Sequence, residues 1–467
     1  MTTIKIQNPA NGNVVRQIQP TTSTEIRAAV DAARSAQAAW AARTLADRIS
    51  IIETFIRLLE QRADQLALTL STETGKPISQ ARGEILATPA RVRYFIEQIR
   101  QTLTPRLVHQ DPDTGRVVGT GALEEIVTYD PLGVVANISA WNYPYFVGSN
   151  VFAPALLTGN AVVYKPSEYA SLTGIAIAAL LHEAGVPQDV FPVILGGGRA
   201  GQTLIDSGVD GVFFTGSHRT GLLVASAAAA HLIPVQLELG GKDPAYVTDG
   251  VDIEKAATAL ADGAFYNAGQ SCCAVERIYV HHSIYREFRR AFLETVKAFK
   301  IGEPTKSDTY IGPLTRQAQL SVLQDQTEDA LGRGATLLLG GKALSGQGWY
   351  FEPTILTDVD HTMKVMTEES FGPIIGIQQV QSDDEAIELM NDSPYGLTAG
   401  VYSPDRTRAT RILQAVQSGS SYWNCCDRVS PRLPWTGRRH SGLGSTLSTE
   451  GIRAFIQPRA WHLKAPQ

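Results

Sequence analysis

The stretch "GVFFTGSHRTGLLVASAAAAHLIPVQLELGG", residues 211–241, contains the pattern that decides the fold. It opens with a short run of Val and Phe that ends at Gly216, continues through an Ala-rich segment, and closes with a second apolar run up to Glu238. Short β-rich runs on either side of a helical segment are typical of two neighbouring strands in a parallel sheet.

The same alternation extends on both sides of this stretch. Upstream we expect strands at residues 124–129, 133–139, 160–168 and 190–196, and helices at residues 171–187 and 199–208. The N-terminal part is expected to be helical over residues 24–40, 45–77 as one long helix, and 78–103. A second alternating section begins near Asp243, with helices at residues 252–269, 283–299 and 316–334, and a strand at 335–341. The pattern predicts doubly wound α/β architecture.

Size and composition restrict the function classes. A chain of 467 residues is long enough for two or three domains. The net charge of −5 comes without a run of like charges, so no nucleic-acid surface or membrane-binding patch is expected. No N-terminal leader of signal-peptide type and no apolar membrane-spanning stretch is visible, which favours a cytoplasmic protein.

Four cysteines occur in two adjacent pairs, Cys272–Cys273 and Cys425–Cys426. So few thiols in a large chain do not make a disulfide framework. Zinc sites usually space their ligands as C-x2-C or wider, whereas adjacent side chains in extended chain point to opposite faces. No metal site is therefore predicted.

Several residues near strand ends are candidates for nucleotide contacts. Lys165 and Glu168 follow an expected strand, where ligands bind in open α/β sheets, and an acidic residue there can hold a ribose 2′-hydroxyl. Gly196, Gly198 and Gly201 have the G-x-G-x-x-G spacing that suits a phosphate at a helix N-terminus. An exposed turn with a solvated ion pair, and an ordinary turn, account for the same residues equally simply.

Three further residues can be combined into a covalent mechanism. Cys272 follows a Gly–Gln turn, Glu238 stands at a strand end before two glycines, and Asn142 lies in a turn where its amide can donate to an oxyanion. Taken singly, each has a simpler explanation. A free cysteine is usually packed, a strand-end Glu is usually solvated, and an Asn in a turn is usually a turn former.

Eight motifs in order give the chain its clearest resemblance. They are "PLGVVANISAWNYP", "GNAVVYKPSE", "FFTGS", "LELGGKDP", "FYNAGQSC", "EESFGP", "YGLTAGVYS" and "PWTGRRHSGLG". With them the chain resembles the aldehyde dehydrogenase superfamily over nearly its whole length. The resemblance implies a Rossmann-like cofactor domain, an α/β catalytic domain and a small β strip for oligomerisation. The implied domains are residues 1–112 with 132–240, residues 241–443, and residues 113–131 with 444–467.

The resemblance also implies roles for individual residues. Cys272 matches the nucleophile, Glu238 the general base and Asn142 the oxyanion-hole amide of the hydrolytic type. The residues matched to NAD contacts are Trp141, Lys165, Ser167, Glu168, Gly198, Phe214, Gly216, Ser217, Gly221, Leu239, Glu369 and Phe371. NADP is possible, but Glu168 is expected to repel its extra phosphate. Cys273 is expected to be a packed neighbour whose side chain turns away from Cys272.

The resemblance leaves the aldehyde open. The expected substrate tunnel comprises Tyr143, Asn150, Cys273, Cys425 and Trp435. Succinate-semialdehyde relatives place an Arg where this chain has Asn150, so a neutral aldehyde of medium size is favoured. A betaine or aminoaldehyde substrate is the first alternative, because Tyr143 and Trp435 resemble part of an aromatic box. Succinate semialdehyde is the second alternative, ranked below it because of Asn150. A structural, non-enzymatic role is disfavoured by the intact catalytic set. A homodimer or homotetramer is expected.

Overall fold

The computed structural model describes residues 3–110 and 123–464. Within these ranges the strands form an N-terminal hairpin and three larger sheets of five, seven and three strands. The hairpin pairs β1 (Ile4–Gln7) with β2 (Val14–Ile18) in antiparallel fashion. No helix in the described part of the chain is long and apolar enough to cross a membrane.

The five-stranded sheet has the order β16-β8-β7-β5-β6 and contains the stretch from which the fold was predicted. Its four parallel strands are β5 (Val134–Ile138), β6 (Ala161–Lys165), β7 (Gly211–Thr215) and β8 (Val235–Glu238). The short β16 (Gly442–Leu443) pairs antiparallel with β8. Because β5 and β6 are buried along their whole length, they consist mainly of Ala, Val and Ile without a regular polar alternation.

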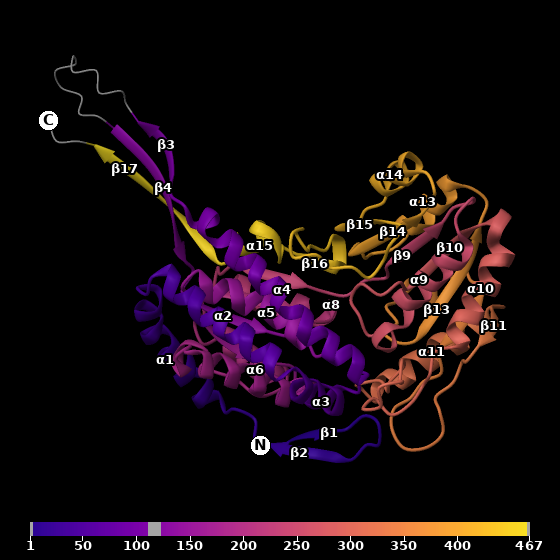
Figure 1. The fold of residues 1–467 in the computed structure, drawn as a ribbon, viewed down its shortest axis with the longest axis horizontal. Helices are drawn as coiled ribbons and strands as arrows, with labels where there is room; N and C mark the ends of the chain where they lie inside the picture. The colour runs from indigo at the N-terminus through magenta and orange to yellow at the C-terminus, as the bar shows by residue number, and fades with distance from the viewer. Residues whose placement is uncertain (1–2, 111–122, 465–467) are drawn as a thin grey trace.

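Helices cover this sheet and carry the chain between its strands (Figure 1). The connecting helices are α5 (Pro144–Leu157), α6 (Ser171–Ala184), α7 (Gly198–Ile205) and α8 (His218–Ala230). The N-terminal helices are α1 (Ser23–Ala41), α2 (Leu45–Gln61), α3 (Ala63–Thr74) and α4 (Ile78–Leu103). The apolar positions that recur every three or four residues in α2, such as Ile52, Ile56 and Leu59, are buried as their spacing predicts.

Two local predictions in this region are wrong. The long helix expected over residues 45–77 is divided at Arg62, whose backbone leaves helical geometry and whose guanidinium pairs with Glu183. No glycine or proline marks this break in the sequence. Residues 190–196 form only an isolated bridge between Val193 and Tyr164, not a strand. Pro192 has no N–H to donate to a ladder, and glycines follow it, so pairing stops after one residue.

The seven-stranded sheet has the order β11-β12-β13-β10-β9-β14-β15. Its parallel strands are β9 (Pro244–Val247), β10 (Arg277–His281), β12 (Thr354–Thr357), β13 (Ile374–Val380), β14 (Thr398–Tyr402) and β15 (Ser420–Trp423); β11 (Thr336–Leu339) runs antiparallel at the edge. Its helices are α9 (Ile253–Phe265), α10 (Tyr285–Lys297), α11 (Ala318–Gly332), α12 (Lys364–Thr367), α13 (Asp383–Asn391) and α14 (Arg406–Ala415).

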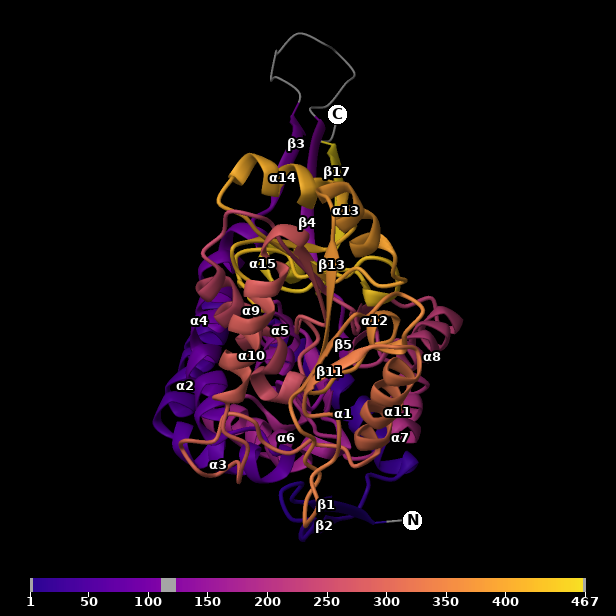
Figure 2. The same cartoon turned by 90° about the vertical axis from the view of Figure 1, so that its right-hand side faces the viewer.

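The three-stranded sheet, of order β17-β4-β3, projects from the body of the molecule (Figures 1 and 2). It pairs β4 (Leu123–Pro131) with both β17 (Ile456–Lys464) and β3 (Arg106–Gln110). The short helix α15 (Ser448–Arg453) precedes β17. Residues 113–122 of the expected bridging segment lie outside the described residues, and the division into domains stays a prediction.

Candidate active site

The turn before Cys272 fixes the position of that residue. Helix α9 ends at Phe265, four residues before the limit that the sequence suggested, and a 3-10 turn (Tyr266–Gly269) follows. Asn267 and Ala268 both have positive φ, 53° and 54°, which is unfavourable for Ala. Such strain persists only where surrounding structure imposes it, and it is concentrated at functional sites.

The side chain of Asn142 is tied to the same turn. Its Nδ2 donates to the carbonyl of Gln270 over 3.2 Å, while Asn267 Nδ2 donates to the carbonyl of Asn142 over 3.4 Å. Asn142 is buried and precedes α5, whose first residue is Pro144. The predicted amide donor therefore contacts Gln270, which stands two positions before Cys272 in the sequence.

Glu238 ends β8 with an unusual set of contacts. Its Oε1 accepts from Thr446 Oγ1 over 2.8 Å and from Gln236 Nε2 over 2.9 Å. No described residue donates to its buried Oε2. Burial raises the pKa of Glu238 to about 8, although these hydrogen bonds oppose the shift. A carboxyl group with such a pKa can take up or release a proton near neutral pH.

The chain connects Glu238 to the cysteine turn over a short path. After β8 it passes through Gly240 and Gly241, and a Cβ atom placed on Gly241 would lie 3.3 Å from the carbonyl oxygen of Cys272. Trp435, whose side chain contributes to the pKa of Glu238, lines the same cavity as Cys272. The segments that carry the nucleophile, base and amide candidates thus approach one another, although they come from three distant parts of the chain.

A cavity of about 520 Å³ opens beside Cys272. Its walls come from α4, α5, the cysteine turn and the segment from Cys426 to Trp435. Four predicted tunnel residues line it, namely Tyr143, Asn150, Cys273 and Trp435. Cys426 lines it in place of the predicted Cys425. Cys426 accepts a hydrogen bond from the Tyr402 hydroxyl, and burial raises the pKa of its thiol to about 12.

Cys273 does not turn away from Cys272 as expected, because both cysteines line the cavity. The expectation assumed extended chain, but the two residues lie in a turn. Cys273 is buried and its thiol donates to Asp427 Oδ1 over 3.0 Å. The hydrogen bond with the Cys272 thiol is the main cause, and burial the second, that raises the pKa of Cys273 well above its ordinary value. Cys273 is therefore a neutral thiol, whereas Cys272 is only partly buried.

The predicted ribose contacts gather at the carboxyl end of β6. Lys165 ends the strand, is buried, and donates to the carbonyl of Pro166 over 3.3 Å. Burial lowers the pKa of Lys165, and the nearby Glu168 opposes this shift. A Cβ atom on Gly197, which precedes α7, would lie 3.6 Å from Glu168 Oε1. Gly198 at the start of α7 faces open space.

The turn from β7 to α8 carries the residues predicted to contact the pyrophosphate. Ser217 caps α8 by accepting from the backbone N–H of Thr220 over 3.4 Å. Ser167 plays the same part for the short helix that contains Glu168. The remaining predicted residues of this region lie close by. Phe214 is in β7, Gly216 is in the turn that follows it, and Gly221 is in α8. Leu239 directly follows β8 and packs on Gly221. Free N–H groups at a helix start favour anions.

The loop from Glu369 to Phe371 reaches the same edge from the other side. Glu369 Oε1 accepts from the backbone N–H of Gly241 over 3.1 Å. A Cβ atom on Gly240 would lie 1.9 Å from this oxygen, so the close approach requires glycine there. Phe371 makes an edge-on contact with Trp141, with ring centroids 5.6 Å apart. Burial, with the carboxylate of Glu276 nearby, raises the pKa of Glu369 to about 8.

A buried ion pair that the sequence analysis missed holds this loop. Lys242 Nζ donates to Glu276 Oε2 over 2.7 Å and to Ser370 Oγ over 2.9 Å. Glu276 in turn accepts from the backbone N–H groups of Ser370 and Phe371. Lys242 directly follows the two glycines of "LELGG", and Glu276 lies four residues after Cys272. Their closeness in sequence to these two motifs was the only sign in the sequence that they belong to the site.

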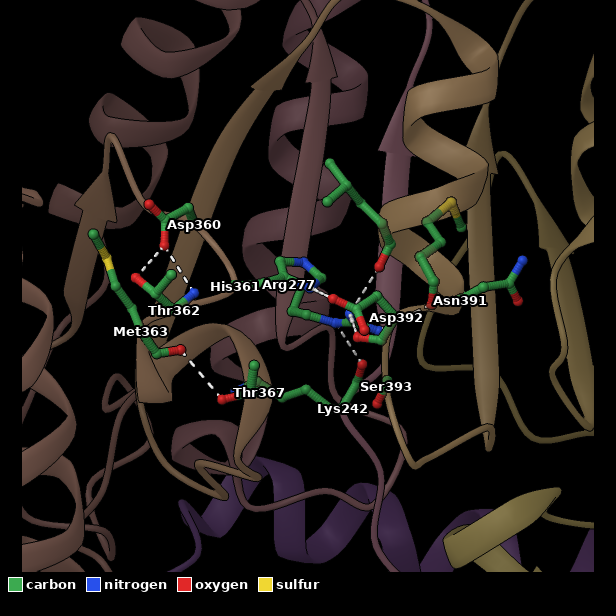
Figure 3. A network of polar contacts seen from close by, with 12 residues as sticks. Lys242, Arg277, Asp360, His361, Thr362, Met363, Thr367, Asn391, Asp392 and Ser393 are labelled. Carbon is green, nitrogen blue, oxygen red and sulfur yellow. Dashed lines mark hydrogen bonds and ion pairs between the residues drawn. The ribbon is translucent and has the colours of Figure 1, made fainter.

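The backbone of Lys242 is itself fixed by Arg277 (Figure 3). The Arg277 Nε donates to the carbonyl of Lys242 over 2.8 Å. Its other nitrogens donate to the carbonyls of Leu389, Met390 and Asp392 at the end of α13, where a positive charge is favourable. The loop from Glu369 to Phe371 is therefore anchored, through Lys242 and Arg277, to strand β10 of the seven-stranded sheet.

The described residues contain no group of three or more His, Cys, Asp or Glu side chains placed to hold a metal ion.

A second missed feature is a set of charged side chains behind the cavity. Lys76 and Glu84 form a buried ion pair, and Arg91 on α4 lines the cavity beside Asn150. No motif in the sequence marks these three residues, because Lys76 lies in the turn before α4 and the other two face inward from α4, whose pattern is that of an amphipathic covering helix.

Comparison with known proteins gives consistent results. A model described as "Aldehyde dehydrogenase family" matches residues 1–461. A "Succinate-semialdehyde dehydrogenase [NADP(+)]" of Deinococcus radiodurans is 35% identical over 453 residues, which cover 97% of this chain and 93% of that protein.

Solved structures agree with this match. The crystal structure of lactaldehyde dehydrogenase from Escherichia coli has a TM-score of 0.94 at 33% identity, covering 100% of this chain and 96% of that one. An NAD-dependent aldehyde dehydrogenase from Sinorhizobium meliloti has a TM-score of 0.94 at 34% identity, covering 100% of this chain and 92% of that one. The predicted fold class is confirmed.

Proposed function

Because the chain belongs to the aldehyde dehydrogenase family, we propose that it oxidises an aldehyde to the carboxylic acid through a thioester on Cys272. NAD+ or NADP+ is the oxidant of this class, in keeping with its NADP- and NAD-dependent relatives. The observations that support the proposal are two contacts around Cys272. Asn142 donates to the carbonyl of Gln270, two residues before Cys272, and Cys272 lines a cavity together with Trp435, whose side chain also acts on the pKa of Glu238.

In the first step the Cys272 thiolate attacks the aldehyde carbon. The negative charge that develops on oxygen is stabilised by the Asn142 amide and the Cys272 backbone N–H, and loss of one such donor typically costs about 10²–10³ in rate. Asn142 is well suited to this because its side chain is buried and its orientation is fixed through Gln270. Cys273 takes no part, since its thiol stays protonated and donates to Asp427.

In the last step Glu238 activates water to release the acid from Cys272. The free Oε2 of its carboxyl group is the atom available to accept a proton, because Oε1 is already occupied by Thr446 and Gln236. A carboxylate in this place favours hydrolysis over transfer of the acyl group to another acceptor.

The residues at the carboxyl ends of β6 and β7 fit a dinucleotide. Lys165 is a buried cation whose ammonium group donates to a neutral carbonyl, that of Pro166, and the starts of α7 and α8 offer backbone N–H groups. We assign Lys165 and Glu168 to the ribose, Ser217 to the pyrophosphate, and Glu369 with Phe371 to the nicotinamide end. When bound, the cofactor supplies the acceptor for the hydride that leaves the carbon attached to Cys272.

The cationic-substrate alternative finds little support in the cavity. Tyr143, the main aromatic candidate, has Lys76 Nζ 3.7 Å from its ring centroid and stacks on Phe146 at 5.9 Å. Its faces are therefore already in use, and one of them holds a positive charge. A betaine or aminoaldehyde would meet repulsion there.

We further propose that the projecting sheet pairs with a second copy of the chain in a homodimer or homotetramer. The outer residues of β17 and all residues of β3 are exposed, and Trp461 and Leu463 are among them. Light scattering of the purified protein tests this, and a monomer at micromolar concentration would contradict it. The expected cytoplasmic location stays a prediction.

The test of the proposed function is a spectrophotometric assay with NAD+ or NADP+ and a panel of aldehydes. We expect aldehyde-dependent reduction of nicotinamide and stoichiometric acid. The absence of turnover with every aldehyde and both cofactors would contradict the proposal.

A further inference from the structure

Arg91 is a buried cation at the cavity wall without an ionic partner. Its side chain is buried, and its one hydrogen bond within the described residues runs from Nη1 to Asn150 Oδ1 over 3.3 Å. No carboxylate of the described residues lies within ion-pairing distance of its guanidinium. Removing one member of a buried pair is costly because it leaves an uncompensated charge, so a buried cation of this kind calls for an anion.

The carboxyl groups that line the cavity are committed elsewhere. Glu84 pairs with Lys76 and also accepts from the backbone N–H of Tyr145 over 2.9 Å. Asp427 accepts from Ser271 and Cys273. Asp262 accepts from the hydroxyl of Tyr310. Glu84 acts on Arg91 only through its field, and none of the three forms an ion pair or hydrogen bond with Arg91, which leaves the guanidinium for a ligand.

Aromatic packing holds the guanidinium in place. The carbon at its centre lies 4.0 Å from the ring centroid of Phe146, whose other neighbour in the stack is Tyr143. Lys76 Nζ lies 3.7 Å from the ring centroid of Tyr143, so each of the two stacked rings has a cation of its own close to its centroid. With one face against Phe146, Arg91 keeps its edge for hydrogen bonds, which is the geometry that binds carboxylates in bidentate fashion.

Arg91 also lies near the reactive thiol. Burial lowers its pKa to about 10, so it remains charged at neutral pH. Cys273 and Glu84, and less strongly Cys272, oppose this lowering of the pKa. Arg91, Asn150 and Cys272 line one cavity of about 520 Å³, which suits a small ligand that spans from the thiol to the guanidinium.

We propose that Arg91 and Asn150 form a subsite for the distal carboxylate of the substrate, so that the preferred substrate is a short aldehyde that carries a carboxylate. This inference rests on the proposed function and replaces the neutral aldehyde expected from the sequence. That expectation considered only position 150, where Asn stands. The guanidinium instead comes from α4, and Asn150 orients it.

The first experiment compares two four-carbon aldehydes, 4-oxobutanoate and butanal, by kcat/KM. We expect 4-oxobutanoate to be favoured by about 10²-fold, the size of a charged hydrogen-bonded pair. Arg91→Gln should lower this ratio to near unity, and Arg91→Lys should give an intermediate ratio because the planar fork is lost. Arg93→Gln on the same helix is the control. Arg93 is exposed, pairs with Glu60, and should leave the ratio unchanged.

The second experiment does not need turnover. Alkylation of Cys272 by iodoacetamide is followed by mass spectrometry with succinate or butyrate present. Succinate should slow alkylation of the wild type several-fold, butyrate should not, and succinate should give no protection to Arg91→Gln.

Three outcomes are distinguishable. A wild type that oxidises neither aldehyde contradicts the proposed function, and succinate protection then still decides the subsite. Equal kcat/KM values for the two aldehydes overturn the subsite alone. If Arg91→Gln fails to fold, shown by loss of its thermal transition, the wild-type ratio and the wild-type protection decide the question.

Discussion

The hydroxyl of Thr446 donates to Glu238 Oε1 over 2.8 Å, although 208 positions separate the two residues. Thr446 is itself paired through its backbone with Trp435, in both directions, at 2.7 and 2.9 Å. The base candidate is therefore positioned by the C-terminal segment of the chain, while the nucleophile candidate is positioned by the turn after α9. The stretch that leads into this C-terminal segment also contacts the cysteine turn, because Asp427 accepts from Ser271 and Cys273.

Glu238→Gln should trap the thioacyl enzyme. The amide cannot accept a proton from water, and general base catalysis typically contributes about 10²–10⁴-fold. Rapid mixing of the variant with cofactor and substrate should give a burst of reduced nicotinamide, followed by a slow steady state. Mass spectrometry should find the acyl group on Cys272. A steady-state rate equal to that of the wild type would assign the base role to another group.

Hydrolysis of the thioester should become faster as pH rises through about 8. Below this value Glu238 is mostly protonated and cannot act as a base; above it the carboxylate form dominates. Because the Thr446 hydroxyl stabilises the charged form, Thr446→Val should move the midpoint to higher pH. Single-turnover hydrolysis rates between pH 6 and 10 measure both curves. Coincident midpoints would contradict the role of this hydrogen bond.

Cys272→Ala should abolish turnover while cofactor binding is kept. Calorimetric titration with NAD+ checks binding, and the aldehyde assay checks activity. Cys273→Ala is the matched variant, and it should retain turnover because the Cys273 thiol is protonated and bonded to Asp427. Activity in Cys272→Ala, together with loss of activity in Cys273→Ala, would exchange the two assignments.

NAD+ should be used at least as well as NADP+. Glu168 lies beside the Gly197–Gly198 turn, where its charge should oppose a 2′-phosphate. Glu168→Ser should raise the NADP+/NAD+ ratio of kcat/KM by about tenfold, since a like-charge contact near a protein surface is worth about 1 kcal/mol or more. Glu183→Gln, a surface change on α6, should leave the ratio as it is. A clear preference of the wild type for NADP+ would contradict this account.

Breaking the Lys242–Glu276 pair should destabilise the fold and the cofactor site together. Glu276→Gln leaves a buried ammonium group without its partner, which typically costs about 3–5 kcal/mol. It also weakens two acceptors for the Ser370–Phe371 backbone, so KM for the cofactor should rise. Lys255→Met, which removes an exposed ion pair, is expected to cost less than about 1 kcal/mol. Urea unfolding compares these variants.

The sequence predicted the sheets well where strands are short, apolar and bounded by turns. Strands β5 to β8 lie where their patterns place them, because burial on both faces and the flanking turns act locally; helix α4 also spans its predicted range, although Pro89 lies inside it. The break at Arg62 and the loss of the strand at residues 190–196 depend on contacts with Glu183 and on a missing proline N–H. Such tertiary contacts do not change the spacing of apolar residues along the sequence, so that spacing does not predict them.

For the site, the motifs pointed to the proposed catalytic residues but not to the residues that hold them in place. Thr446, Lys242 and Glu276 are recognisable only once distant segments are brought together. Arg91 shows the limit most clearly. Position 150 alone suggested a pocket without a cation, yet the cation enters from a helix some sixty residues earlier in the chain. A spatial substitution of this kind cannot be seen along the sequence.

Helix α4 links two parts of the molecule that otherwise have little in common. It carries Arg91 in the cavity wall, ends at Leu103, and leads within three residues into β3 of the projecting sheet. With a rise of about 1.5 Å per residue, the stretch from Arg91 to the helix end is a rod of roughly 18 Å. Because α4 is a continuous helix, a tilt of the projecting sheet would also move Arg91, the residue proposed to select the substrate.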